Sequence, residues 1–172
     1  MRIAIGSDHR GFATKEQIKR MLVSKGYDVE DFGTDSRVSC DYPDTAVPAC
    51  RAITGGRFEV GILLCGSGIG MSISANKVRG IRAALCHDEL TAEMSRRHNN
   101  ANVLCLPADL VGEELTRRIV EVWLKTPFEG GRHGRRVQKI GDYEQEELGD
   151  GEHRPNVHPE TKPAAGDENQ AT

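Results

Sequence analysis

The most glycine-rich stretch of the chain begins with a cysteine. It reads Cys65-Gly66-Ser67-Gly68-Ile69-Gly70 and lies between a continuous apolar run over 60–65 and a segment with helical character. A glycine backbone can point several N–H groups into one concavity, and a helix N-terminus adds positive potential there. The stretch therefore predicts a site for a phosphate, a carboxylate or a developing oxyanion.

Three well-known loop motifs do not fit these residues. A dinucleotide fingerprint starting at Gly66 needs a glycine where Met71 stands. A phosphatase loop starting at Cys65 needs an arginine at that same position, and a P-loop is excluded because no Gly-Lys-Ser/Thr is present. The loop is glycine-rich without belonging to any of these classes.

Cys65 has two interpretations. A thiol at the junction of a strand end and a helix start favours the reactive thiolate, and Ser67 is near enough in sequence to hydrogen-bond the sulfur. Alternatively, Cys65 only completes an apolar strand, as we expect for Cys86 and Cys105. The glycines that follow favour the functional interpretation. The five cysteines are odd in number and lie mostly in apolar runs, which indicates reduced thiols and a cytoplasmic protein rather than disulfides.

Further polar residues follow the first predicted strand and a later turn. Asp8, His9 and Arg10 stand in a row, whereas helix capping alone would need only Ser7 or Asp8. These residues therefore indicate a site. Tyr42 lies in a turn that leads into a helix, where it is either a packed aromatic residue or a substrate contact.

Two clusters near helix ends also have a structural alternative. His98 and Asn99 end a helix, where cations and asparagine commonly cap, but an imidazole titrates near neutral pH and can act as a general acid. Arg132 and Arg136 share one helical face, which suits either a phosphate clamp or a solvated basic surface.

The elements that must position these residues alternate between short apolar runs and longer amphipathic segments. The pattern predicts strands over 3–6, 27–32, 60–65, 81–86 and 102–106, and helices over 11–25, 43–53, 69–78, 88–98, 111–125 and 132–147. Such alternation predicts an α/β fold with a five-stranded parallel sheet and helices on both faces. Ligands of such sheets bind at the carboxyl ends of the strands, which selects 6–10, 65–70 and 86–88.

Composition limits the protein class. The chain has 172 residues, 18.9 kDa and a formal net charge of −3, and no apolar run approaches the ~20 residues of a membrane span. Its N-terminal residues lack the pattern of a secretory signal. Residues 144–172 carry a net charge of −6, so 1–143 carry +3, which suits a small anionic ligand better than nucleic acid. We expect one domain over 1–148 and a disordered acidic tail over 149–172.

Six short segments together resemble the ribose-5-phosphate isomerase B family, which includes the related galactose- and allose-6-phosphate isomerases. They occur in family order over about 1–140 and read Ser7-Asp8-His9-Arg10-Gly11-Phe12, Asp41-Tyr42-Pro43, Cys65-Gly66-Ser67-Gly68-Ile69-Gly70, Ala75-Asn76-Lys77, Arg97-His98-Asn99, and Gly130-Gly131-Arg132-His133 with Arg136.

The resemblance implies an aldose–ketose isomerase that uses neither metal nor cofactor and interconverts ribose 5-phosphate and ribulose 5-phosphate through a cis-enediolate. It also implies a three-layer α/β/α Rossmann-like sandwich in a homodimer or tetramer, with active sites across the dimer interface and no nucleic-acid or membrane partner. The roles it implies are Cys65 as the base, Ser67 as support for its thiolate, backbone N–H groups of Gly66, Gly68, Ile69 and Gly70 for the enediolate, His98 for ring opening, Asp8 and Asn99 for hydroxyls, Tyr42 as pocket lining, and His9, Arg132 and Arg136 for the phosphate.

One position departs from the family pattern. Several relatives carry an arginine in the loop after the fifth strand, where this chain has Asp109, which would repel a phosphate. Either Arg135 or another cation takes over, or the substrate is shifted or different; a hexose 6-phosphate and a tetrose phosphate are alternatives. From other classes, a cysteine-nucleophile hydrolase or acyl transferase and a non-catalytic sugar-phosphate sensor also remain open.

Overall fold

The five predicted strands form one parallel sheet. The computed structural model describes residues 1–149, so the predicted tail lies, apart from Gly149, outside the described residues. The sheet order is β2-β1-β3-β5-β4 and every pairing is parallel. The elements are β1 Arg2–Ser7, α1 Phe12–Ser24, β2 Asp28–Asp31, α2 Tyr42–Thr54, β3 Val60–Cys65, α3 Ile69–Ala75, β4 Ala83–Leu85, α4 Glu89–Asn99, β5 Val103–Pro107, α5 Glu113–Lys125 and α6 Gly131–Gly149.

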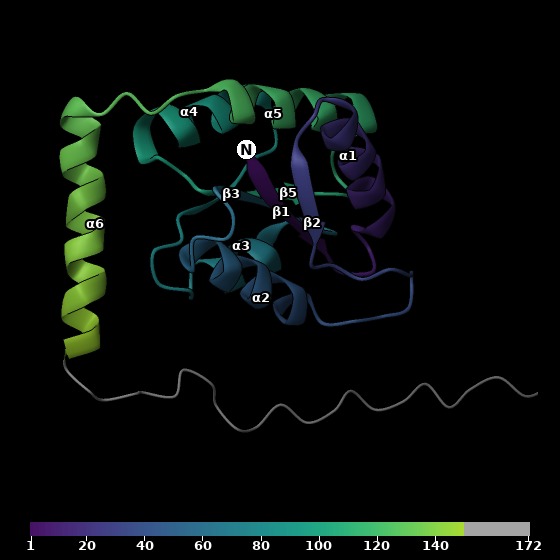
Figure 1. Cartoon of the computed structure of the whole chain (residues 1–172), viewed down its shortest axis with the longest axis horizontal. Coiled ribbons are helices and arrows are strands. Elements are labelled where there is room, and N and C mark those ends of the chain that lie inside the picture. Colours follow the sequence, from purple (N-terminus) through teal and green to yellow (C-terminus); the bar gives the residue numbers. More distant parts are fainter. Residues whose placement is uncertain (150–172) are drawn as a thin grey trace, which may run out of the picture.

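Helices cover both faces of this sheet, which confirms the predicted three-layer α/β/α sandwich (Figure 1). Helices α1, α4 and α5 pack on one face, and α2 and α3 pack on the other. The central strand β3 is buried along its whole length, as its continuous apolar run predicts.

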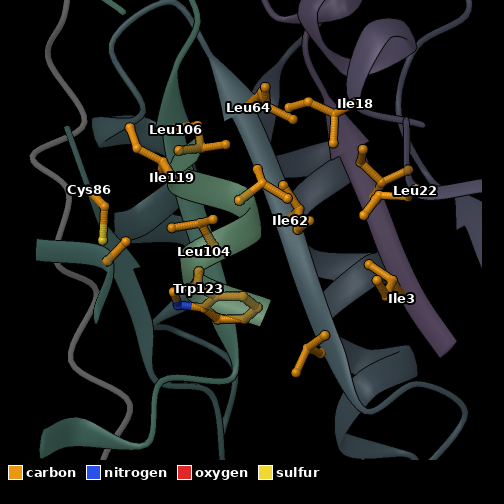
Figure 2. Close-up of a cluster of buried hydrophobic side chains, with 14 of the residues drawn as sticks. Ile3, Ile18, Leu22, Ile62, Leu64, Cys86, Leu104, Leu106, Ile119 and Trp123 are labelled. Atoms are coloured by element: carbon orange, nitrogen blue, oxygen red, sulfur yellow. The ribbon is translucent and has the colours of Figure 1, made fainter. Parts of the chain in front are cut away.

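The core on the α1, α4 and α5 face is built from alternate side chains of β3 and β5. Ile62 and Leu104 belong to the same buried cluster as Leu22 of α1 and Trp123 of α5 (Figure 2). Burying a side chain of this size stabilises a fold by about 1.5–3 kcal/mol. The indole N–H of Trp123 donates to Ser95 Oγ at 3.1 Å, so its one polar group is satisfied inside the core.

Two elements are shorter than predicted because of one side chain. The Asn76 amide nitrogen donates to the carbonyls of Ser72 and Ala83, and its oxygen accepts from the Ala83 N–H. These bonds cap α3 at Ala75 and also occupy the first backbone groups of β4. The helix therefore ends at Ala75 instead of residue 78, and β4 begins at Ala83 instead of residue 81.

Helix α6 stands beside the sandwich instead of covering the sheet (Figure 1). It packs against α4, and its Glu144 carboxylate accepts from the Gly80 N–H at 2.9 Å. Ile140 and Tyr143 on this helix are exposed. Among residues 1–149, no helix combines the length and apolar character needed to cross a membrane.

Candidate active site

The sulfur of Cys65 lies where β3 passes into α3. Its side chain is only 4% exposed, and Sγ accepts a hydrogen bond from the Gly68 N–H at 3.1 Å. Gly68 has a φ of +73°, a left-handed conformation that turns its amide back toward the sulfur. The loop thus places one backbone N–H donor on the sulfur.

Ser67 pairs differently from the expectation. Its Oγ accepts from the Ile69 N–H at 3.4 Å, and the hydrogen bond to the sulfur comes from Gly68 instead. The left-handed turn at Gly68 explains this, because it brings a backbone N–H to the sulfur. Among the described residues the Ser67 hydroxyl is not bonded to the sulfur, and its support of the thiolate stays a prediction.

Several amides of the loop have no partner in the described part of the chain. The N–H groups of Gly66, Ser67 and Gly70 have no acceptor in residues 1–149. The Cys65 and Gly66 carbonyls accept from Ala108 and Asp109, which fixes the loop against the end of β5. The free amides thus remain available to an anion or a developing oxyanion.

Cys65 borders a pocket of about 440 Å³ at the carboxyl edge of the sheet. Strands β1, β3 and β5 end side by side there, since Ser7 pairs with Leu64 and Cys65 with Pro107. The pocket is lined by Asp8, Arg10, Tyr42, Cys65, Gly66, Ser67, Gly70, Asp109 and Leu110. This is the edge that the sequence predicted for ligand binding.

Asp8 and Tyr42 both lie at this pocket, as predicted. Asp8 is 5% exposed, and its Oδ1 accepts from the N–H groups of Arg10 and Gly11 at 2.9 and 3.0 Å, so this carboxylate also orders the turn into α1. The Tyr42 ring lies directly against Gly70, where an added Cβ would come within 2.8 Å of it.

His9 is not among the described residues that line the pocket. Its Nδ1 accepts from the Cys40 N–H at 3.2 Å. The segment that carries Cys40 is tied to α1 by buried Lys15, whose Nζ donates to Asp31 Oδ2 and to the Thr34 carbonyl at 2.6 and 2.7 Å. His9 is therefore held at the rim, next to the pocket residues Asp8 and Arg10.

His98 and Arg132 belong to a second cluster between α4 and α6, and Asn99 and Arg136 lie on the same two helices. The rings of His98 and His133 stack with their centroids 4.1 Å apart, and Glu129 Oε2 lies 3.8 and 3.6 Å from their Nε2 atoms. Arg132 Nε lies 3.3 Å from His133 Nε2. Glu129 and His133 are not among the predicted site residues. The sequence signal for them is that they flank Gly130-Gly131, in one of the segments that carry the family resemblance.

Neighbouring charges in this second cluster shift the pKa values of His133 and Glu129. Burial lowers the pKa of His133, and the nearby charges of His98 and Arg132 lower it further. The hydrogen bond from Arg97 Nε, 2.7 Å long, lowers the pKa of Glu129. His133 is thus held neutral near pH 7, beside an ionised carboxylate.

The three groups His98, Glu129 and His133 bring their ligand atoms within 4.8 Å of one another. Their geometry does not suit one metal ion, because the imidazole planes are parallel at 2° and their in-plane lone pairs do not converge. Arg97 also occupies Glu129. We assign no metal to this cluster.

The fold places the two clusters at opposite edges of the sheet. Helix α4 starts at the carboxyl edge after β4 and returns to the amino edge, so His98 and Asn99 lie near the start of β5. Helix α6 follows α5, which returns in the same way, so Arg132 also begins at the amino edge. Within one chain, the pocket lining contains Cys65 but not His98, Asn99, Arg132 or Arg136.

Comparison with known proteins agrees with this architecture. A family model described as ribose/galactose isomerase matches residues 3–140. The chain belongs to the ribose/galactose isomerase family. It is accordingly an enzyme of the aldose–ketose isomerase type.

Individual members of this isomerase family are similar over nearly their whole length. Ribose-5-phosphate isomerase B of Escherichia coli is 46% identical over 144 residues, which cover 84% of this chain and 97% of that protein. D-erythrulose-4-phosphate isomerase of Pectobacterium atrosepticum is 47% identical over 146 residues, covering 84% and 96%. The structure of ribose-5-phosphate isomerase B from Clostridium thermocellum superposes with a TM-score of 0.84 at 49% identity, covering 86% of this chain and 99% of that chain.

Proposed function

We propose that the chain interconverts ribose 5-phosphate and ribulose 5-phosphate through a cis-enediolate, with Cys65 as the base. The observation that carries this proposal is the Cys65 sulfur, which accepts the Gly68 N–H and borders a pocket next to unpaired backbone amides. That arrangement supplies both a proton acceptor and an oxyanion site at one place.

The chemistry starts from the open-chain aldose. The Cys65 thiolate removes the proton from C2, and negative charge develops on O1, where the amides of Gly66, Ser67 and Gly70 stabilise it. The thiol then returns the proton to C1, while the hydroxyl proton on O2 moves to O1. The carbonyl is now at C2, and no atom has entered or left.

The group for ring opening and two of the cations for phosphate binding come from a second copy of this chain. His98 would transfer the proton that opens the furanose ring, Asn99 would hold a hydroxyl, and Arg132 and Arg136 would bind the phosphate together with His9. The support is topological, because one chain keeps His98 and Cys65 at opposite sheet edges. In a homodimer or tetramer with sites across the interface, His98 of one chain can reach the Cys65 pocket of the other chain. We assign the enzyme to the cytoplasm, where its five free cysteines stay reduced.

A tetrose phosphate is a second candidate substrate. The relative named D-erythrulose-4-phosphate isomerase is as similar to this chain as the ribose-5-phosphate isomerase B of Escherichia coli is. Asp8 and Tyr42 can hold the hydroxyls of either sugar, since both substrates present the same carbonyl end.

The proposal is tested with Cys65→Ser on a panel of four-, five- and six-carbon aldose phosphates. We expect kcat to fall at least about 100-fold, because a serine hydroxyl is a far weaker base at neutral pH. Cys40→Ser is the matched control, since Cys40 does not line the pocket, and its activity should stay within about twofold.

Solvent exchange separates this reaction from a hydrolase or a sensor. In D₂O the isomerase incorporates deuterium at the transferred position, and EDTA leaves the rate unchanged. A cysteine-nucleophile hydrolase would instead leave a covalent adduct on Cys65, and a sensor would bind the sugar without conversion. An unchanged rate for Cys65→Ser would remove this residue from the mechanism.

A further inference from the structure

Arg10 is the one cationic side chain among the described residues that line the Cys65 pocket. The other charged groups in that lining are Asp8 and Asp109. An anionic sugar phosphate that enters this half of the site therefore meets two carboxylates and one guanidinium. Among the described residues of this lining, Arg10 is the only one whose side-chain charge attracts the phosphate.

The guanidinium of Arg10 is held in a defined place. Nε and Nη2 both lie 2.6 Å from Asp109 Oδ2, and the pair sits directly over the backbone of the cysteine loop. A Cβ added at Gly66 would come within 2.5 Å of Asp109 Oδ2 and 2.7 Å of Arg10 Nε. The absence of a side chain at Gly66 is what lets the pair approach the loop.

The pair leaves part of the guanidinium unused. Asp109 takes one edge of the fork through a single oxygen, so the N–H groups of Nη1 stay open, and the Arg10 side chain is 61% exposed. A carboxylate that orients an arginine reduces the entropy lost when the arginine binds a second anion. Asp109 itself is fixed, because its N–H donates to the Gly66 carbonyl at 3.0 Å.

We propose that Arg10, oriented by Asp109, binds the phosphate group of the substrate. This assignment deepens the proposed function and rests on it for the identity of the sugar. It also gives Asp109 a role. The Asp109 carboxylate would itself repel a phosphate, but it positions the Arg10 guanidinium that binds one.

Binding of inorganic phosphate to Arg10→Gln tests the proposal without any turnover. We expect the dissociation constant measured by calorimetry to rise at least about fivefold, since a charged hydrogen bond is lost. With ribose 5-phosphate as substrate, KM should rise about tenfold while kcat stays within about threefold, because Arg10 does not touch the reacting carbons. Arg10→Lys keeps the charge without the fork, and its dissociation constant should rise about threefold.

Arg57→Gln is the matched control. Arg57 is 60% exposed and pairs with a carboxylate, that of Glu30, but it does not line the pocket, so its phosphate affinity and KM should equal those of the unmodified protein. Unchanged phosphate affinity in both Arg10 variants, or an equal fall of kcat and kcat/KM that marks a merely structural role, would overturn the assignment. If no aldose phosphate is converted but Arg10→Gln still weakens phosphate binding, the proposed reaction fails and this assignment stands.

Discussion

At the scale of single residues, the environment of each sulfur separates one cysteine from the others. Cys65, Cys50 and Cys105 belong to the same buried cluster, but of these three only Cys65 accepts an N–H and borders the pocket. Burial raises the pKa of Cys50 to about 12 and raises that of Cys105 as well. These two thiols are therefore protonated, and inert toward electrophiles, throughout the neutral pH range.

This difference predicts the pattern of thiol alkylation in the folded protein. With iodoacetamide at pH 8, we expect modification of Cys65 and of the partly exposed Cys40, and protection of Cys50 and Cys105. Mass spectrometry of the digested protein measures the modified fraction at each site. Modification of Cys50 before Cys65 would contradict this account of their environments.

Residue types and spacing predicted much of this site, but not its hydrogen bonds. The alternating glycines after a buried strand identified the Cys65 loop, the end of the first strand placed Asp8 at the same edge, and Tyr42 followed from the family resemblance. They did not identify the donor to the sulfur, because that depends on the left-handed turn at Gly68. The pairing of Arg10 with Asp109 is likewise a contact between residues 99 positions apart, which no local pattern contains.

At the scale of elements, the start of α3 depends on glycine at position 68. Its φ is +73°, and an added Cβ would lie 2.4 Å from Leu85 Cδ1 and 3.0 Å from the backbone carbon of Leu106. We expect Gly68→Ala to lower the free energy of unfolding by more than about 2 kcal/mol, since backbone strain and a steric clash add.

Gly26→Ala measures the cost of the left-handed backbone strain without a steric clash. Gly26 has a similar φ of +81°, but nothing lies within 4 Å of the place that an added methyl group would take, so the loss should be about 1 kcal/mol. Urea denaturation followed by circular dichroism measures both variants. Equal losses for the two would show that packing around Gly68 is not a constraint.

The junction of α4 and α6 should respond to acid through His133. Since its pKa is lowered in the folded state, the unfolded chain binds this proton more readily. The stability that neutral His133 contributes is complete above its unfolded pKa of about 6.5 and is lost as the pH falls through the folded value.

An NMR titration of the histidine ring protons measures this shift. We expect the midpoint of His133 below 6.5, and lower still in Glu129→Gln, because the Glu129 carboxylate is the group that raises it. Glu89→Gln, at the other end of α4, should leave the midpoint unchanged. A midpoint above 6.5 would mean that the ring is solvated and charged.

Apolar periodicity identified every element of the sheet and its helices, and the errors have local causes. The alternation over 27–32 correctly indicated an edge strand, and β2 is at the edge. The length of α3 was wrong because Asn76 replaces the next helical turn with side-chain bonds. Periodicity also gave no sign that α6 leaves the sheet, since an amphipathic helix looks the same whichever surface it packs on.

At the scale of the whole molecule, the site proposed here needs two chains. Equal amounts of Cys65→Ser and His98→Asn, each inactive alone, are mixed in denaturant and refolded together. In a symmetric dimer, half of the molecules are mixed and each has one intact site, so activity should return to about a quarter of that of the unmodified protein. Mixed dimers that form, as seen by native mass spectrometry, but remain inactive would place both residues in one chain's site.

The domain itself should end with α6. The family match covers residues 3–140, and the described sandwich and its helices are complete by Gly149. We expect a chain truncated after Gly149 to keep its kcat within about twofold and its melting temperature within about 2 °C. A large loss of activity would show that residues 150–172 contribute to the site.

The single tryptophan of the chain lies on only one face of the sheet. Trp123 is fully buried among α4, α5 and the strands, with the Arg96 guanidinium 5.0 Å from its ring. Intrinsic fluorescence therefore reports the layer formed by these helices. The layer of α2 and α3, with the cysteine loop, holds no tryptophan, so a sugar phosphate can bind there without changing the tryptophan emission. Followed beside circular dichroism, that one indole would reveal whether the two layers melt together or one after the other.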